Sequence, residues 1–443
     1  MFFRRALAQI QRHHPLSARL PCTTRPPRST VELLKADTSY NTPLTLTQAV
    51  SLSSLTQNSL EAETGASIGV SKDGGILNVK WQEGPDARFH GVWLRHNCHC
   101  DQCRAPAGQR KKNVLDYPET ATISDLHLHD DYVALSWYEE KGHVTRVPLQ
   151  FLRQHCYSKE VLEKRDMDSR PKTYSQEGIP QISLKDVQNS QEGLLRWLEY
   201  ISDYGMCLVK DIPTKPEQIA KTFQVVNEPD PINIAYSVSR LNLHMDLLNY
   251  ESPPGLQLLH CLSFDSCVTG GGSHLLDVFH VAERFRESHP QEFRDLARIP
   301  ATFQRIHFER ENPVYMTFQR PHILLNHRDE IAAVFWTQQN EGPLAVAEED
   351  VEAYYRAYRL FAAQIRFSDM LKCVKLEPGD AIVFNNRRVL HGREEFTLNG
   401  GRRHLEGCYV NIDEFKSHYR CLSHALGRPV GEPARRVGNQ CWF

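Results

Sequence analysis

The 443-residue sequence has no long hydrophobic run, no internal repeat and no large excess of charge of either sign. No apolar stretch approaches the 18 or more residues that a membrane-spanning helix needs, so no membrane partner is expected. The formal net charge is −2 at pH 7, so the chain as a whole has no electrostatic attraction for nucleic acid. With 40% hydrophobic and 24% charged residues, the sequence is typical of a globular protein with one large domain or two ordinary ones.

Acidic residues are missing from the first 31 positions. This stretch contains six arginines, and the first acid of the chain is Glu32. An Arg-rich, acid-free segment without a long apolar core is typical of a mitochondrial transit peptide, whereas a secretory signal needs such a core. We therefore predict a transit segment over residues 1–35, a location in the mitochondrial matrix, and a Ser/Thr-rich linker over 36–65. The alternative is a disordered basic tail on a cytoplasmic protein.

Short β-type runs separated by turn residues follow the linker. Ile76–Trp81 and Tyr132–Trp137 are examples, and they predict a small β-rich domain over residues 66–157. The charged, proline-containing stretch 158–176 is predicted to be a linker. Residues 177–443 would then form a second, larger domain.

The larger region combines many short strand-like runs with a few amphipathic helices. Gln191–Ile201 and Val351–Phe361 carry apolar residues at helical spacing. Ala381–Phe384 and Arg403–Val410 have the composition of buried strands. This pattern predicts a mainly β fold with helices, in which a sandwich or barrel has helical buttresses.

An H-x-D triplet provides the first candidate metal ligands. His244 and Asp246 are two residues apart, so on an extended chain both side chains point to the same face. His391 lies near the end of a later predicted strand. Two histidines and one carboxylate form the facial triad of non-haem Fe(II) oxygenases, which leaves positions open for cosubstrate and O₂. Alone, an H-x-D triplet in a chain with 21 histidines is more often a solvated loop.

An arginine downstream of His391 strengthens the interpretation of these residues as a metal site. Arg403 begins the next predicted strand, and a buried guanidinium can bind a dicarboxylate through two parallel hydrogen bonds. A metal triad followed by such an arginine is what a 2-oxoglutarate oxygenase requires. A metal-dependent hydrolase could use the same three ligands, but it needs no dicarboxylate cosubstrate.

Several longer stretches, taken together, are specific to one family. They are Asn233–Tyr236, His244–Asp246, Pro253–Cys261, Thr269–Gly271, Glu377–Asp380, Val389–Arg393 and Arg403–Gly407. From about Gln191 to Ser423 the chain resembles the γ-butyrobetaine dioxygenase and trimethyllysine dioxygenase family of Fe(II)/2-oxoglutarate oxygenases. The resemblance implies a double-stranded β-helix (jelly-roll) core. It also implies that His244, Asp246 and His391 bind iron and that Arg403 holds the distal carboxylate of 2-oxoglutarate.

Three cysteines close together suggest a second metal. Cys98, Cys100 and Cys103 fall within six positions, and a fourth ligand would complete a tetrahedral zinc site. We predict His143 as that ligand, with His99 as the local competitor and three free thiols as the alternative. Because all four ligands would be protein groups, the zinc would be structural. The family resemblance supports His143, since the family's N-terminal domain has the same cysteine spacing with a distant histidine.

The resemblance also implies how a betaine substrate would bind. A quaternary ammonium cannot donate hydrogen bonds, so recognition relies on an aromatic cage and cation–π attraction. Tyr236 and Tyr409 match cage tyrosines of the family, and Asn233 matches a residue that helps hold the substrate carboxylate. Ordinary core packing is the alternative for each of them.

The sequence departs from the family pattern at the substrate end. The segment 213–232 is shorter than in the family, and Phe223 stands where a cage tryptophan would be. Met245 replaces a threonine, and Arg387 replaces a tryptophan. A family asparagine expected around residues 335–338 is not evident. These departures suggest an altered substrate pocket.

We therefore predict an Fe(II)- and 2-oxoglutarate-dependent dioxygenase that hydroxylates γ-butyrobetaine to L-carnitine, with succinate and CO₂ as co-products. The cysteine cluster and the stretch His404–Gly407 favour this branch of the family. Trimethyllysine dioxygenase is the nearest alternative, and a non-catalytic zinc-containing scaffold is an alternative of another class. The expected cofactors are Fe(II), 2-oxoglutarate, ascorbate and structural zinc. The expected partners are the betaine, 2-oxoglutarate and O₂, and the family suggests a homodimer.

Overall fold

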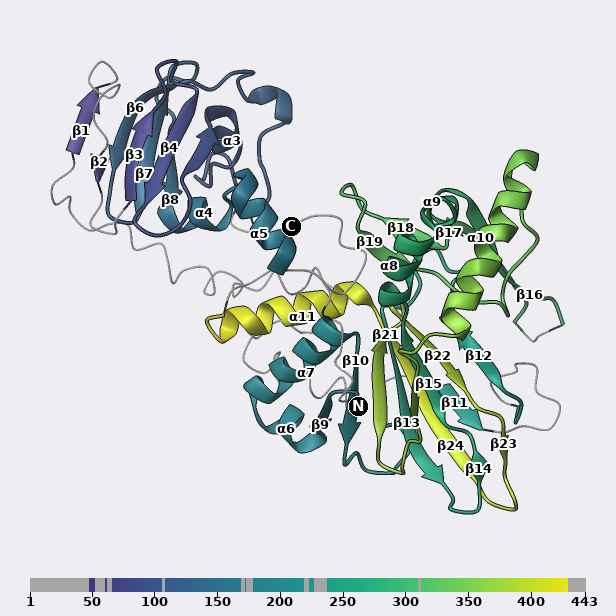
Figure 1. Cartoon of the computed structure of the whole chain (residues 1–443). Helices are drawn as coiled ribbons and strands as arrows, with labels where there is room; N and C mark the ends of the chain where they lie inside the picture. Colours follow the sequence, from purple (N-terminus) through teal and green to yellow (C-terminus); the bar gives the residue numbers. More distant parts are fainter. Residues whose placement is uncertain are drawn as a thin grey trace. The chain divides into compact units, whose positions relative to one another are not determined.

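The structure is a computed structural model in which the chain divides into two compact units, with the division in the sequence between Met167 and Asp168 (Figure 1). The residues described are 48–51, 60–61, 66–105, 108–168, 172, 178–218, 223–226, 237–309 and 312–428. The predicted transit segment 1–35 lies outside the described residues. Among those described, no helix combines the length and the apolar character that crossing a membrane takes.

Two four-stranded antiparallel sheets make up most of the N-terminal unit. One has the order β1 (Gln48–Ser51), β6 (Ile123–Leu128), β7 (Tyr132–Trp137) and β8 (Val144–Pro148). The other has the order β2 (Leu60–Glu61), β3 (Ala66–Val70), β4 (Ile76–Trp81) and β5 (Ala87–His90). Strands β3 and β8 alternate buried and more exposed residues, which is the pattern of a sheet with one face on a core. The helices of this unit are α3 (Gly91–His96), α4 (Leu149–Gln154) and α5 (Lys159–Asp168).

Some of these elements fall in segments for which linkers were predicted. Strands β1 and β2 lie within residues 36–65, and each is the edge strand of its sheet. Helix α5 occupies the first part of residues 158–176. Edge strands this short carry too few residues for a visible period-2 pattern. Helix α5 has no apolar face to mark it, since its ten residues KEVLEKRDMD are mostly charged.

The C-terminal unit is built on two sheets that face one another. The six-stranded sheet has the order β11 (Phe223–Val226), β24 (Arg403–Val410), β13 (Leu256–Phe264), β21 (Ala381–Asn385), β10 (Met206–Lys210) and β9 (Gln181–Ser183). The four-stranded sheet has the order β12 (Leu241–His244), β22 (Val389–Arg393), β15 (Ser273–Asp277) and β20 (Lys372–Val374). These non-sequential strand orders across two sheets are those of a double-stranded β-helix. The predicted mainly β fold with helices and a jelly-roll core is confirmed.

Strand alternation assigns the side chains of the large sheet to two cores. On β21, Ile382 and Phe384 join a cluster that also includes Leu275 and Val389 of the small sheet, so this core lies between the two sheets. Their neighbours on β21 pack on the opposite face with α6 (Leu184–Asn189), α7 (Gln191–Tyr204) and α11 (Ile412–Ala425) (Figure 1). The inner face of the large sheet is therefore the one available for a site.

A third core joins the remaining helices to short strands. The helices are α8 (Val278–Ser288), α9 (Pro290–Arg298) and α10 (Glu348–Arg366). The strand pairs are β16 (Pro300–His307) with β17 (Val314–Pro321), and β18 (Ile323–Leu325) with β19 (Ile331–Val334). A separate two-stranded sheet pairs β14 (Thr269–Gly270) with β23 (Phe396–Thr397). Phe285, Phe303 and Phe361 of this core are fully buried. Strand β16 extends from this core to one wall of the cavity described below.

Candidate active site and metal centres

His244, Asp246 and His391 come together at one end of the small sheet. His244 ends β12 and is paired in register with His391 on β22, and their ring centroids are 4.2 Å apart. Asp246 Oδ1 lies 3.3 Å from His244 Nε2, and Asp246 Oδ2 lies 3.7 Å from His391 Nε2. The three ligand atoms lie within 4.8 Å of one another. Register brings the predicted ligands together although they are far apart in sequence.

The protonation of this group suits a divalent metal. His244 donates through Nδ1 to the carbonyl of Asn242 at 2.8 Å, which leaves the Nε2 lone pair directed at the group. Burial, with the neighbouring His244, lowers the pKa of His391, so its imidazole is neutral. Burial alone would raise the pKa of Asp246, but hydrogen bonds and charges from both histidines outweigh it and hold the pKa well below the usual range. Two imidazoles and a carboxylate are the donor set that an Fe(II) triad requires.

Two side chains from the large sheet fix the carboxylate of Asp246. Gln257 Nε2 on β13 donates to Asp246 Oδ2 at 2.9 Å, and the hydroxyl of Tyr409 on β24 donates to the same oxygen at 2.7 Å. Because Oδ2 already accepts two hydrogen bonds, Oδ1 is the oxygen left for a metal. Hydrogen bonds of this kind, made to a metal ligand by residues that do not themselves bind the metal, orient the carboxylate.

The backbone around Asp246 is held as well. Asn386 accepts a hydrogen bond from the backbone N–H of Asp246 at 2.9 Å and donates one to its carbonyl at 2.9 Å. The N–H of Met245 donates to the carbonyl of Trp336 at 2.8 Å. Asp246 is therefore positioned by the turn that follows β21 and, through Met245, by the segment that follows β19.

Arg403 lies on the inner face of β24 and lines the same cavity as the triad. Its guanidinium packs against the rings of Phe264 and Phe396, with centroid distances of 5.5 and 5.2 Å. Its hydrogen bond to the carbonyl of Gly271 is long, at 3.4 Å, and its buried Nε has no partner among the described residues. A buried, charged group with unused donors is suited to a carboxylate ligand.

The neighbouring Arg393 has a different role. Its guanidinium donates to the carbonyls of Ser237 and Ser239, each at 2.7 Å, so it holds the backbone that leads into β12. Burial and Arg393 lower the pKa of Arg403 to about 10, which leaves Arg403 charged at neutral pH. Arg403 is therefore the guanidinium free to bind a dicarboxylate.

The cavity that contains these groups has a volume of about 660 Å³. Arg403 and Ser273 lie at one side, and the triad and Tyr409 also face it. Beyond the strands of the two sheets, its wall comes from the loop after the triad, from the end of β16 and from the loop after β19: Leu247, Asn249, Tyr250, Gln304, Arg305, Ile306, His307, Gln339, Asn340 and Glu341. Such a volume is enough for a small organic substrate beside a cosubstrate.

Glu341 places an acid in the wall of the cavity. One carboxylate oxygen accepts from the hydroxyl of Tyr358 at 2.9 Å, and the other is buried without a partner. Burial raises the pKa of Glu341 to about 7 despite the hydrogen bond from Tyr358. Within the described part of the chain, no Lys, Arg or His forms an ion pair with it. Sequence reasoning missed Glu341, because an isolated acid in a loop is normally a solvated surface group.

The other predicted substrate residues are only partly visible. Asn233, Tyr236 and half of the short segment 213–232 lie outside the described residues. Phe223 begins β11 and pairs with Gly407, but its side chain is outside the described set. Among the four predicted substrate residues, Tyr409 is the one whose side chain can be placed, and its hydroxyl binds Asp246.

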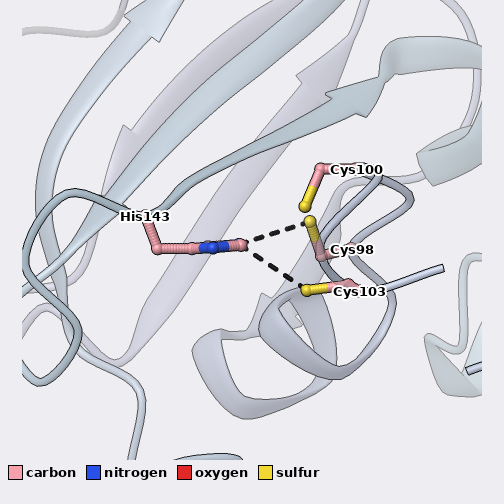
Figure 2. A group of neighbouring side chains, drawn as sticks. All are labelled: Cys98, Cys100, Cys103 and His143. Carbon is pink, nitrogen blue, oxygen red and sulfur yellow. Dashed lines mark hydrogen bonds between the residues drawn. The ribbon is translucent and has the colours of Figure 1, made fainter. Parts of the chain in front are cut away.

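In the N-terminal unit the three cysteines converge on His143 (Figure 2). His143 Nε2 lies 3.4 Å from the sulfur of Cys98 and 3.9 Å from that of Cys103, and all four ligand atoms lie within 4.8 Å of one another. The loop after α3 carries the cysteines, and the turn between β7 and β8 carries His143. The ring of His99 is exposed and packs against Phe151 instead. This donor set fits a closed zinc site.

A buried ion pair supports this cluster. Arg95 donates to the sulfur of Cys103 at 3.3 Å and forms an ion pair with Glu140 at 2.6 Å. Arg95 is fully buried, so it places a positive charge against ligands that would be thiolates when metal is bound. The sequence motif gave the ligands but no signal for Arg95, which precedes them on α3.

Comparison with known proteins places both units. Residues 168–409 match the family described as taurine catabolism dioxygenase TauD, TfdA family. Residues 68–140 match the family described as gamma-butyrobetaine hydroxylase-like, N-terminal. Together the two matches cover almost all of the jelly roll and the part of the N-terminal unit that contains Cys98, Cys100 and Cys103.

Individual relatives align with most of the chain. Gamma-butyrobetaine dioxygenase from Pseudomonas sp. (strain AK-1) is 31% identical over 365 residues, which covers 78% of this chain and 93% of that protein. The Homo sapiens gamma-butyrobetaine dioxygenase is 27% identical over 373 residues, covering 78% of this chain and 94% of that protein. The mitochondrial trimethyllysine dioxygenase of Bos taurus is 27% identical over 377 residues, covering 78% and 88% respectively.

Proposed function

The chain belongs to the TauD, TfdA family of dioxygenases, and on that premise we propose that it hydroxylates γ-butyrobetaine to L-carnitine with Fe(II) and 2-oxoglutarate. The observation that carries the proposal is that His244, Asp246 and His391 line one cavity together with the buried guanidinium of Arg403. Oxidation of an unactivated C–H bond needs a metal with open positions and a site for the cosubstrate. The cavity has room for both.

Each group of the cavity then has a defined task. His244, His391 and Asp246 Oδ1 would hold Fe(II), which when bound supplies the oxidising chemistry as 2-oxoglutarate is converted to succinate and CO₂. Gln257 and Tyr409 keep the carboxylate of Asp246 in place. Arg403 would bind the distal carboxylate of 2-oxoglutarate and so set the end of the cavity at which the cosubstrate lies.

Glu341 supports a cationic substrate. A buried carboxylate without a cation is costly, and a quaternary ammonium in the cavity would supply that cation. Tyr250 lines the same wall and provides an aromatic face. We propose that Glu341 and Tyr250, together with Tyr236 and Asn233, bind the betaine.

The N-terminal unit would have a structural role. Cys98, Cys100, Cys103 and His143 would bind one zinc ion with no open position, so the metal would stabilise the fold and take no part in oxidation. For the first 35 residues we propose mitochondrial targeting, which agrees with the mitochondrial trimethyllysine dioxygenase of Bos taurus as a relative. Import of the full chain into isolated mitochondria, followed by N-terminal sequencing, tests this proposal.

The activity is tested with the full chain, Fe(II), ascorbate and 2-oxoglutarate. Parallel reactions contain γ-butyrobetaine, trimethyllysine or no substrate, and both succinate and the hydroxylated product are measured by mass spectrometry. We expect succinate formation to rise with γ-butyrobetaine and to vanish in the Asp246→Ala variant. Stimulation by trimethyllysine alone would reassign the substrate within the family. Iron binding without turnover on either betaine would favour the non-catalytic scaffold.

A further inference from the structure

A group of three potential metal ligands lies on the C-terminal unit apart from the triad. His274 is on β15, Cys373 is on β20, and Glu394 follows the end of β22. Their ligand atoms lie within 4.8 Å of one another. None of the three lines the cavity of the triad.

Strand register explains why these side chains meet. His274 and Cys373 are directly opposed in the antiparallel pair of β15 and β20, and Glu394 follows Arg393, which is opposed to Ser273. Because alternate residues point to opposite faces, His274 lies on the face of the small sheet away from Ser273 and Leu275. Those two residues face the cavity and the core between the sheets, respectively.

The distances match those of a tetrahedral metal site. Glu394 Oε1 lies 3.4 Å from His274 Nε2 and 3.5 Å from the sulfur of Cys373. Metal–ligand bonds of about 2.0 Å to O and N and about 2.3 Å to S, at tetrahedral angles, place such atoms roughly 3.3–3.5 Å apart. The ligands therefore need little movement to bind a common ion.

Charge and exposure indicate what kind of ion would bind. A thiolate and a carboxylate would together neutralise a divalent cation, and the mixed N, O and S donors favour Zn²⁺ and similar transition metals over Mg²⁺ or Ca²⁺. Glu394 Oε2 accepts from the N–H of Gly272 at 3.3 Å, which fixes the carboxylate. Cys373 is exposed to solvent, so a fourth position would remain open to water.

We propose that His274, Cys373 and Glu394 form an exchangeable binding site for Zn²⁺ or a similar transition-metal ion on the outer face of the small sheet. The ion would link β15, β20 and the end of β22. Ser273 and Arg393, the immediate neighbours of two ligands, line the cavity on the opposite face. The proposed site therefore lies one sheet thickness from the cosubstrate end of the cavity.

Cobalt titration of the full chain tests the proposal, with the protein purified so that the cysteine cluster keeps its zinc. Co²⁺ at this site gives a thiolate-to-cobalt charge-transfer band, which the triad cannot give because it has no sulfur ligand. Because the triad also takes up Co²⁺ without contributing to this band, we expect the band to saturate by two equivalents of Co²⁺ in total and excess Zn²⁺ to abolish it. The band should be absent from Cys373→Ser and present in Cys267→Ser, which changes another exposed thiol.

Two further measurements make the result specific. His274→Asn and Glu394→Gln should each weaken Co²⁺ binding about 10-fold or more without changing the melting temperature. Zn²⁺ should protect Cys373 from alkylation by iodoacetamide and leave Cys267 reactive. A band of equal intensity in Cys373→Ser, or the lack of any titratable band in the wild-type chain, would overturn the proposal.

Discussion

Replacement of Arg403 by methionine provides the sharpest test of the proposed cosubstrate site. Methionine keeps an unbranched apolar side chain between the rings of Phe264 and Phe396 and removes only the guanidinium. If Arg403 binds the distal carboxylate of 2-oxoglutarate, the change leaves that carboxylate buried and unpaired. Loss of one partner from a buried, hydrogen-bonded charge pair costs about 2–5 kcal/mol. Since each 1.4 kcal/mol is tenfold, the KM for 2-oxoglutarate should rise about 30-fold to several thousand-fold.

The effect on stability should be the opposite of the effect on binding. In the ligand-free protein the guanidinium has one long hydrogen bond, to Gly271, and a buried Nε without a partner among the described residues. Replacing an uncompensated buried charge by an apolar group of similar length is neutral or stabilising. The melting temperature of Arg403→Met should therefore be equal to that of the wild type or higher.

The assay measures succinate formation against 2-oxoglutarate concentration, together with thermal unfolding of each variant. Arg402→Met is the matched control, because Arg402 is the preceding residue and is exposed. It should leave both KM and melting temperature nearly unchanged. The reasoning is refuted if Arg403→Met keeps a KM for 2-oxoglutarate within about twofold of the wild type. It is also refuted if the melting temperature of Arg403→Met falls clearly below that of the wild type.

Three further predictions test other parts of the structure. Removal of zinc by a chelator, or Cys98→Ser, should unfold the N-terminal unit, because structural zinc contributes on the order of 10 kcal/mol; circular dichroism and zinc content check this, with Cys156→Ser as the control that keeps the metal. Asp277→Asn should destabilise the C-terminal unit by about 3–5 kcal/mol in urea unfolding, because it leaves Arg388 buried without its 2.6 Å partner. Asp369→Asn, which breaks an exposed pair with Arg284, should leave the urea unfolding transition nearly unchanged. Because burial raises the pKa of Glu341 to about 7, its carboxylate is charged above that pH, so the KM for γ-butyrobetaine should fall as pH rises through about 7. This step should be missing in Glu341→Gln and present in Glu349→Gln, and steady-state kinetics from pH 6 to 8 would show it.

The parts of the structure that follow from strand geometry could be predicted from the sequence. The spacing of His244 and Asp246 placed both side chains on one face, and the structure brings them to His391 through a register pair of β12 and β22. The cysteine spacing likewise indicated a cluster with a distant histidine, and His143 lies beside it. In each case the chemistry depends on residue type and on local periodicity, which the sequence contains directly.

Other elements depend on features that periodicity does not capture. The apolar spacing over Phe279–Leu296 predicts one continuous helix, and this prediction is wrong, because the structure has α8 and α9 with a break at His289. Pro290 has no backbone N–H to continue α8, and it occupies the first position of α9, where none is needed. The apolar pattern continues across the break since both helices pack on the same core.

One end of the cavity is built from sheet strands and the other end from loops. This difference decides how far family membership determines function. Arg403 on β24 is in register with Phe264 on β13, and Ser273 on β15 is in register with Arg393 on β22. The positions of Arg403 and Ser273 therefore follow from strand pairing. The opposite wall comes from loops near Tyr250 and Glu341, whose positions depend on packing across the molecule.

Met245 and Arg387, the two residues that depart from the family pattern near the triad, both lie outside the cavity. Met245 is buried in the helical core, and Arg387 donates to the carbonyl of Pro253 at 2.6 Å. Neither side chain lines the cavity, so neither alters substrate contacts directly. Both act on the stretch from Leu247 to Pro254, which carries Asn249 and Tyr250 to the cavity wall. Differences in substrate preference from the family should consequently arise through the placement of this loop, with the iron and 2-oxoglutarate contacts unchanged.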